Sequence, residues 1–80
     1  MSQVDARKLD FYDRQVVQLI IDKYGIKERE AVRNFIESET YQMLLDVELD
    51  IYKMSPHIIF DMWESEKVTG DPRNSQYIRE

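Results

Sequence analysis

The stretch Ser55-Pro56-His57-Ile58-Ile59-Phe60-Asp61-Met62-Trp63, which continues to Gly70, decides the fold of this chain. Ser55 is a favourable N-cap, Pro56 suits the first helical position, and Gly70 stands where a helix ends. Apolar side chains occupy five of the six positions from 58 to 63. They surround the predicted helix instead of forming one stripe, so this helix needs cover on several sides. The sequence therefore predicts a small all-α bundle of three or four helices with this helix at its centre.

A long helix is predicted near the start of the chain, over residues 6–24. Asp5 can accept hydrogen bonds from the free amides of the first turn, and Gly25 suits the left-handed residue that follows a helix. Between them, apolar residues recur at helical spacing. These residues are Leu9, Tyr12, Val16, Ile20 and Tyr24. The pattern predicts one buried face.

Residues 28–45 are predicted to form either two helices or one. The apolar face of the first part is narrow and comprises Ala31, Val32, Phe35 and Ile36. Ser38 is a candidate cap for a further helix that ends at Leu45. No Gly or Pro forces a break near Ser38, so a continuous helix from 28 to 45 stays open as the alternative.

A short extended connector is predicted before the last helix, over residues 46–52. Its central part, Val47-Glu48-Leu49-Asp50-Ile51, alternates in polarity with the period of a strand. No other segment of the chain alternates in this way, so a strand here would need a partner from another copy. An extended connector and an intermolecular strand both remain open.

Eighty residues suffice for one small domain, which we place at residues 1–72 and follow with a polar C-terminal tail at 73–80. Hydrophobic residues make up 42% of the chain and charged residues 34%, which is typical of globular proteins rather than disordered ones. The sequence contains no cysteine, no secretion signal and no long apolar run. We therefore expect a cytoplasmic protein that has no disulfide and does not enter a membrane.

The net charge of −5 is concentrated in the middle of the chain. Residues 34–66 contain eight acidic side chains and a single Lys or Arg, Lys53. Because phosphates attract cations, this stretch disfavours nucleic acid as a partner and favours a basic protein. A regulatory chain that uses its acidic middle to bind a basic protein is therefore one alternative function.

A small DNA-binding regulator is a second alternative. Gly25 separates two predicted helices, and the cations Lys27, Arg29 and Arg33 follow it, as in a helix-turn-helix. However, glutamates at positions 28, 30 and 37 interrupt that surface. Ion pairs on an exposed helix face explain the same residues.

The sequence predicts no catalytic, cofactor-binding or metal-binding residue, and we do not expect an enzyme. The only histidine, His57, is followed by Asp61 and Glu64 at helical spacing. A local ion pair on one helix explains this trio better than a metal or acid–base site, since no second His or Cys completes it. The acids at 46, 48 and 50 resemble the start of a calcium loop, but Ile51 replaces the required glycine.

A non-enzymatic protein-interaction module is the function we predict from these patterns. The central helix and the residues before it carry more apolar and aromatic surface than a chain of this length can easily cover. The candidate interface consists of Tyr52, Met54, Ile58, Phe60, Met62 and Trp63. We expect self-association as a homodimer through this surface, or a dedicated protein partner.

Three stretches carry a resemblance to a known group of proteins. They are residues 39–46 (ETYQMLLD), residues 55–64 (SPHIIFDMWE) and residues 69–75 (TGDPRNS). These stretches resemble a family of short uncharacterised all-helical proteins from Gram-positive bacteria, over roughly residues 15–77. The resemblance implies a helical fold and a bacterial cytosolic setting, and by association an accessory or antitoxin-like role.

Overall fold

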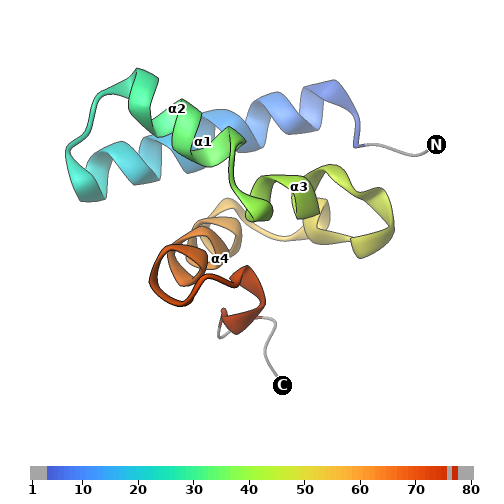
Figure 1. Ribbon diagram of the computed structural model, residues 1–80. Helices are drawn as coiled ribbons and strands as arrows, with labels where there is room; N and C mark the ends of the chain where they lie inside the picture. Colours follow the sequence, from blue (N-terminus) through green and yellow to red (C-terminus); the bar gives the residue numbers. More distant parts are fainter. Residues whose placement is uncertain (1–3, 76, 78–80) are drawn as a thin grey trace.

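The computed structural model describes residues 4–75 and 77, and within them the fold consists of helices and turns without a β-strand (Figure 1). The all-α fold class is therefore confirmed. In chain order the elements are α1 (Ala6–Tyr24), α2 (Glu28–Ile36), α3 (Glu39–Leu45), the short 3₁₀ turns η1 (Val47–Leu49) and η2 (Ile51–Lys53), α4 (Pro56–Thr69) and a third 3₁₀ turn, η3 (Pro72–Asn74).

The ends of α1 and α4 lie where the capping residues predict them. The Asp5 carboxylate accepts a hydrogen bond from the Arg7 backbone N–H, and the Ser55 hydroxyl accepts one from the first turn of α4. Gly25 and Gly70 close these helices with φ of 66° and 84°, a left-handed conformation that glycine adopts without steric cost. Local backbone chemistry thus determines where both long helices stop.

Ser38 separates α2 from α3, which confirms the two-helix prediction for residues 28–45. Its hydroxyl donates a hydrogen bond to the Phe35 carbonyl at the end of α2 and accepts one from the Tyr41 N–H in the first turn of α3. One buried side chain therefore satisfies a carbonyl of the first helix and an amide of the second.

The predicted extended connector before α4 is wrong, since residues 47–53 form two 3₁₀ turns. The Asp46 carboxylate accepts a hydrogen bond from the Glu48 N–H and starts η1, and Asp50 then reverses the chain with a φ of 60°. Without a partner strand, the backbone amides find acceptors within each turn instead. Burial follows the alternating polarity only in part, because Ile51 is buried whereas Leu49 is 46% exposed.

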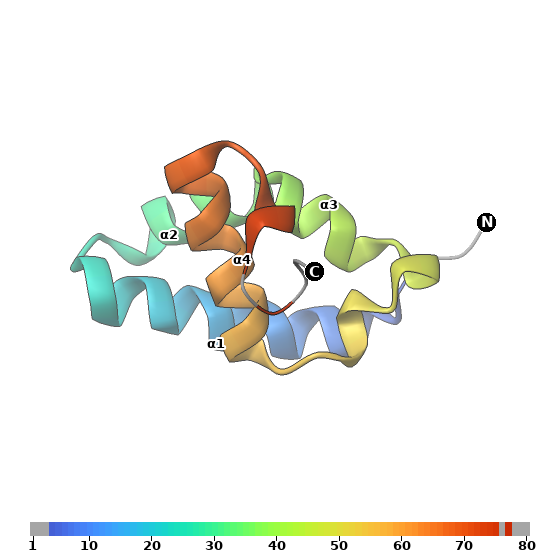
Figure 2. The ribbon, with the colours of Figure 1, turned by 90° about the horizontal axis from the view of Figure 1, so that it is seen from below.

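The core lies where α4 meets the other helices. Figure 2 shows α4 between α1 and α3, with η3 beside its C-terminal half, and α4 packs against all three. Every helix contributes buried side chains to this core, among them Val16, Ile20, Phe35, Leu44, Ile59 and Met62, all with no exposed surface. The chain thus covers Ile59, Met62 and Trp63 of α4 and leaves Ile58 and Phe60 partly exposed.

The chain stays packed beyond the domain boundary expected at residue 72. Pro72 and Ser75 are fully buried, and the Ser75 hydroxyl donates a hydrogen bond of 2.5 Å to the Asp61 carboxylate of α4. Arg73 reaches the Glu39 carboxylate at the start of α3, at 2.5 Å. The segment up to residue 75 therefore belongs with the helices, and residues 76 and 78–80 of the expected polar tail lie outside the described residues.

Candidate functional site

Two of the six candidate interface residues, Met62 and Trp63, belong to the core. Met62 has no exposed surface, and only 4% of Trp63 is exposed. The indole N–H of Trp63 donates a hydrogen bond to the Asn34 carbonyl, and its ring meets the Tyr24 ring edge-on. These two side chains offer no surface to a partner of the folded chain. The prediction of a polar tail after residue 72 left out η3, which packs against α4.

The other four candidates, Tyr52, Met54, Ile58 and Phe60, are partly exposed, and Tyr52, Met54 and Phe60 pack against the core. The Tyr12 hydroxyl lies within hydrogen-bond distance of the Tyr52 and Met54 carbonyls and donates its single hydrogen to one of them at a time, and the ammonium of Lys8 lies 5.2 Å from the centre of the Tyr52 ring. Phe60 stacks on Trp63 with ring centres 6.1 Å apart. These residues thus make internal contacts and also retain some surface.

The acidic middle of the chain is used largely to hold the fold together. The Glu66 carboxylate accepts hydrogen bonds from the backbone N–H groups of Glu39 and Thr40 and from the Thr40 hydroxyl, at 2.8–2.9 Å. Glu64 contacts the Lys23 ammonium at 2.6 Å and accepts a hydrogen bond from the Tyr24 hydroxyl, and both hydrogen bonds raise the pKa of the donor group. Most of these carboxylates therefore already contact groups of their own chain.

Most carboxylates of residues 34–66 make a contact of this kind. Six of the eight contact a group within the chain. These six are Glu39, Asp46, Asp50, Asp61, Glu64 and Glu66.

The trio on α4 does not form a chemical site. His57 is exposed, whereas Asp61 binds Ser75 and Glu64 binds Lys23. Among residues 4–75 and 77, no three metal-ligating side chains cluster closely enough to hold an ion. Within the same residues, no helix combines the length and the apolar character that crossing a membrane requires.

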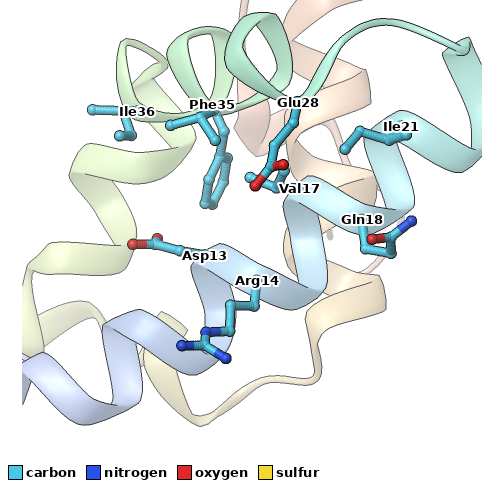
Figure 3. Close-up of a pocket in the computed structure, with 9 residues that line it drawn as sticks. Asp13, Arg14, Val17, Gln18, Ile21, Glu28, Phe35 and Ile36 are labelled. Atoms are coloured by element: carbon cyan, nitrogen blue, oxygen red, sulfur yellow. The ribbon is translucent and has the colours of Figure 1, made fainter.

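A groove between α1 and α2 has a volume of about 360 Å³ (Figure 3). Its lining from α1 recurs at helical spacing, and the facing wall comes from α2. The nine lining residues are Asp13, Arg14, Val17, Gln18, Ile21, Glu28, Val32, Phe35 and Ile36. The residues on α1 from 13 to 21 extend over about 12 Å of helix axis.

The floor of this groove is apolar and only partly covered. Phe35 and Val17 are buried beneath it, and Ile21 and Val32 keep part of their surface exposed. Ile36, at one end of α2, has 42% of its surface exposed. The groove thus presents aliphatic side chains to solvent between two rigid helices.

Asp13 places an unpaired carboxylate oxygen in the groove wall. Its Oδ1 atom is buried and has no hydrogen-bond partner within the described residues. Burial, and secondly repulsion from Asp10, raise the pKa of this carboxyl above its ordinary value. Burial, and secondly the charge of Asp13, likewise raise the pKa of the Tyr41 phenol of α3. Figure 3 shows the carboxylate directed away from the α1 axis, on the side of Phe35 and Ile36.

The sequence does not predict this groove. Its pattern places Val32 and Ile36 on the narrow apolar face that follows residue 28 and predicts no role for Asp13. The sequence feature that indicates the groove is Asp13, a charged residue within the apolar stripe of α1. It lies one helical turn after Leu9 and one before Val17.

Comparison of the chain with models of known protein families, with curated proteins and with solved structures found no match.

Proposed function

We propose that this chain is a cytoplasmic, non-enzymatic protein-interaction module, and that the groove between α1 and α2 binds a helix of its partner. The observation that carries this proposal is the partly exposed aliphatic floor of that groove, formed by Ile21, Val32 and Ile36. An amphipathic helix laid in an apolar groove is a recurrent mode of protein recognition.

The energetic case depends on the apolar surface that a partner would cover. Fully burying one aliphatic side chain contributes roughly 1.5–3 kcal/mol, and a partly exposed one contributes a fraction of this. Three partly exposed aliphatic side chains spread along the groove, with Ile21 and Ile36 at its opposite ends (Figure 3), therefore provide a small hydrophobic surface with the polar groups Gln18 and Glu28 at its border. In a regulatory or antitoxin-like role, the module would bind a helix of its partner in this groove and cover it.

The test compares two glutamate substitutions of exposed apolar residues. Ile36→Glu places a charge in the groove, whereas Val68→Glu changes a residue on α4 that is 85% exposed and does not line the groove. The wild-type chain and the Val68 variant should capture the same binding partner from cells that express the protein, and the Ile36 variant should not. Equal capture by both variants would exclude the groove as the binding surface.

Self-association is the second candidate function, because four of the six candidate interface residues retain surface. Tyr52, Met54, Ile58 and Phe60 are each partly exposed. If copies pair through these residues, light scattering on the purified chain will give twice the monomer mass, and Phe60→Ser will restore the monomer. A strict monomer at high concentration would exclude this candidate.

A further inference from the structure

We propose that two copies of this chain pair about a two-fold axis at the end of the molecule where α1 begins, with the acidic turn η1 of each copy seated on a cationic and aromatic hollow of the other. This inference goes beyond the α1/α2 groove and does not depend on it. It also places self-association at a surface other than the one named above, and the two surfaces share only Tyr52.

The first half of the contact is a hollow beside the first turns of α1. It has a volume of about 330 Å³ and is lined by Arg7, Lys8, Phe11, Tyr12 and Tyr52, none of which is acidic. Phe11 has 51% of its surface exposed, and Tyr52 is partly exposed beneath the Lys8 ammonium. The hollow thus offers both positive charge and aromatic surface to a partner.

The two cations of this hollow lack a partner within the fold. Arg7 and Lys8 are exposed in the first turn of α1, at the positive end of the helix dipole, where a cation is unfavourable. The carboxylate of the N-cap, Asp5, accepts a hydrogen bond from the backbone of Arg7 and not from its side chain. Among residues 4–75 and 77, neither cation forms an ion pair, whereas Arg14 of the same helix pairs with Asp10. An anionic group from outside the fold would offset both charges.

The second half of the contact is the turn η1. Its last two residues, Glu48 and Leu49, are both exposed, and Leu49 keeps 46% of its surface. In the described part of the chain, the Glu48 carboxylate has no hydrogen bond or ion pair, since only its backbone N–H is bonded, to Asp46. A carboxylate next to a large aliphatic side chain complements the hollow, with Glu48 opposite the Lys8 ammonium of the other copy and Leu49 against its Phe11 ring.

Both halves lie at the same end of the molecule. The Val4 N–H donates a hydrogen bond of 3.2 Å to the Leu45 carbonyl, which ties the entry to α1 to the end of α3, just before η1. The turn η2, which carries Tyr52, packs against η1. Figures 1 and 2 both show the start of α1 together with η1 and η2 at one end. Because the two complementary features share this end, one two-fold rotation can place each against its counterpart and close a dimer.

The charges at this end favour a second copy over other anionic partners. A nucleic acid or an anionic membrane attracted by Arg7 and Lys8 would also meet the carboxylates of Asp46, Glu48 and Asp50. A second copy instead supplies both signs of charge, each on a separate feature. The net charge of −5 on each copy opposes pairing at long range, but physiological salt screens this repulsion beyond about 8 Å, whereas the paired groups are in contact.

The experiment reverses one charge in each half of the contact and then mixes the two variants. Sedimentation equilibrium of the full chain is measured up to about 1 mM, a concentration at which even a weak pair is populated. Lys8→Glu and Glu48→Lys each place like charges at both contacts of the two-fold pair. Each variant alone should therefore dimerise at least about tenfold more weakly than the wild type.

The equimolar mixture of the two variants is the decisive sample. At one contact the two reversed residues meet, and at the other the two native residues meet, so opposite charges face one another at both. The mixture should form a heterodimer with the affinity of the wild-type dimer. Recovery in the mixture also shows that both variants fold.

Two controls match the changes in net charge. Arg29→Glu and Glu37→Lys alter exposed residues of α2 and its C-cap, outside the hollow and outside η1. Both should dimerise within about twofold of the wild type, because distant charges are screened. Leu49→Ser tests the apolar part of the contact and should weaken the dimer about tenfold, whereas Val68→Ser, at another exposed aliphatic residue, should not.

Three outcomes would overturn the proposal. A wild-type chain that stays monomeric over this range excludes the pairing and leaves the groove untested by it, since none of the substituted residues lines the groove. Charge-reversal variants that dimerise as well as the wild type also exclude it, and loss of the dimer in Phe60→Ser would then assign self-association to the other surface. Species larger than a dimer would contradict the two-fold arrangement, because a contact that does not close continues from copy to copy.

Discussion

The Glu66 carboxylate of α4 lies at the N-terminus of α3 and accepts hydrogen bonds from both the backbone N–H and the hydroxyl of Thr40, at 2.9 and 2.8 Å. The two residues are 26 positions apart, so this contact fixes one helix to the end of another. Its charge also complements the partial positive charge of the helix N-terminus.

Removal of this carboxylate should destabilise the fold. Glu66→Ala leaves two amides and a buried hydroxyl without their acceptor, so we expect the free energy of unfolding to fall by about 2 kcal/mol. Urea denaturation followed by circular dichroism measures this change. The control is Glu37→Ala, an exposed glutamate for which we expect a change within about 0.5 kcal/mol. Similar losses in both variants would contradict a specific role for Glu66.

Trp63 should behave as a core residue in solution. It is the only tryptophan of the chain and is 4% exposed, so its fluorescence should be blue-shifted and resistant to quenching by acrylamide. Trp63→Ala should cost about 3–5 kcal/mol of stability, as for other large core side chains. Emission typical of water-exposed indole in the folded protein would contradict the packing described for α4.

Gly25 should be required because of its backbone conformation, and not because a larger side chain would clash with a neighbour. Its φ is 66°, and a Cβ atom at this position would meet no atom within 4 Å. Gly25→Ala should therefore cost about 1–2 kcal/mol, the penalty of a left-handed conformation. Gly25→Asn should cost less, because Asn tolerates this conformation better. Thermal unfolding of the two variants checks this order, and equal losses would indicate that something other than backbone conformation is responsible.

Asp13 should make the protein less stable at neutral pH than it would be with a neutral side chain. Because burial raises the pKa of Asp13 in the folded state, the folded chain holds this proton more tightly than the unfolded chain does. The stabilisation by this proton is fully present below the pKa that Asp13 has in the unfolded chain. It is lost as the pH rises through the pKa that Asp13 has in the folded chain. Asp13→Asn should therefore stabilise the chain at neutral pH, by up to about 1 kcal/mol, and the difference should vanish in acid. A difference that is constant with pH would show that burial of the charge is not the cause.

The helix boundaries could be predicted because they depend on local chemistry. Asp5, Ser38 and Ser55 each accept a hydrogen bond from an amide two or three residues later, and this requires no knowledge of the rest of the fold. For the same reason Gly25 and Gly70 marked the helix ends correctly. The prediction failed at residues 47–51, where alternation of polarity fits both a strand and a pair of 3₁₀ turns with one buried residue.

The candidate site could not be predicted because it depends on how the helices meet. Phe60 and Trp63 are adjacent on one helix, but the packed chain buries Trp63 and leaves Phe60 partly exposed. The groove arises from the placement of α2 against α1. The surroundings of Asp13 also include Tyr41, from a third helix. None of these relationships is encoded within one segment of sequence.

The central claim is that the α1/α2 groove binds a helix of a partner, and intermolecular nuclear Overhauser effects test it most directly. In a complex of the methyl-labelled full chain with an amphipathic helical peptide that carries Leu on one face, the leucine protons of the peptide should contact the methyl groups of Val32 and Ile36. Contacts confined to Ile58 and the Met54 methyl group, on the other surface that retains apolar exposure, would contradict the account.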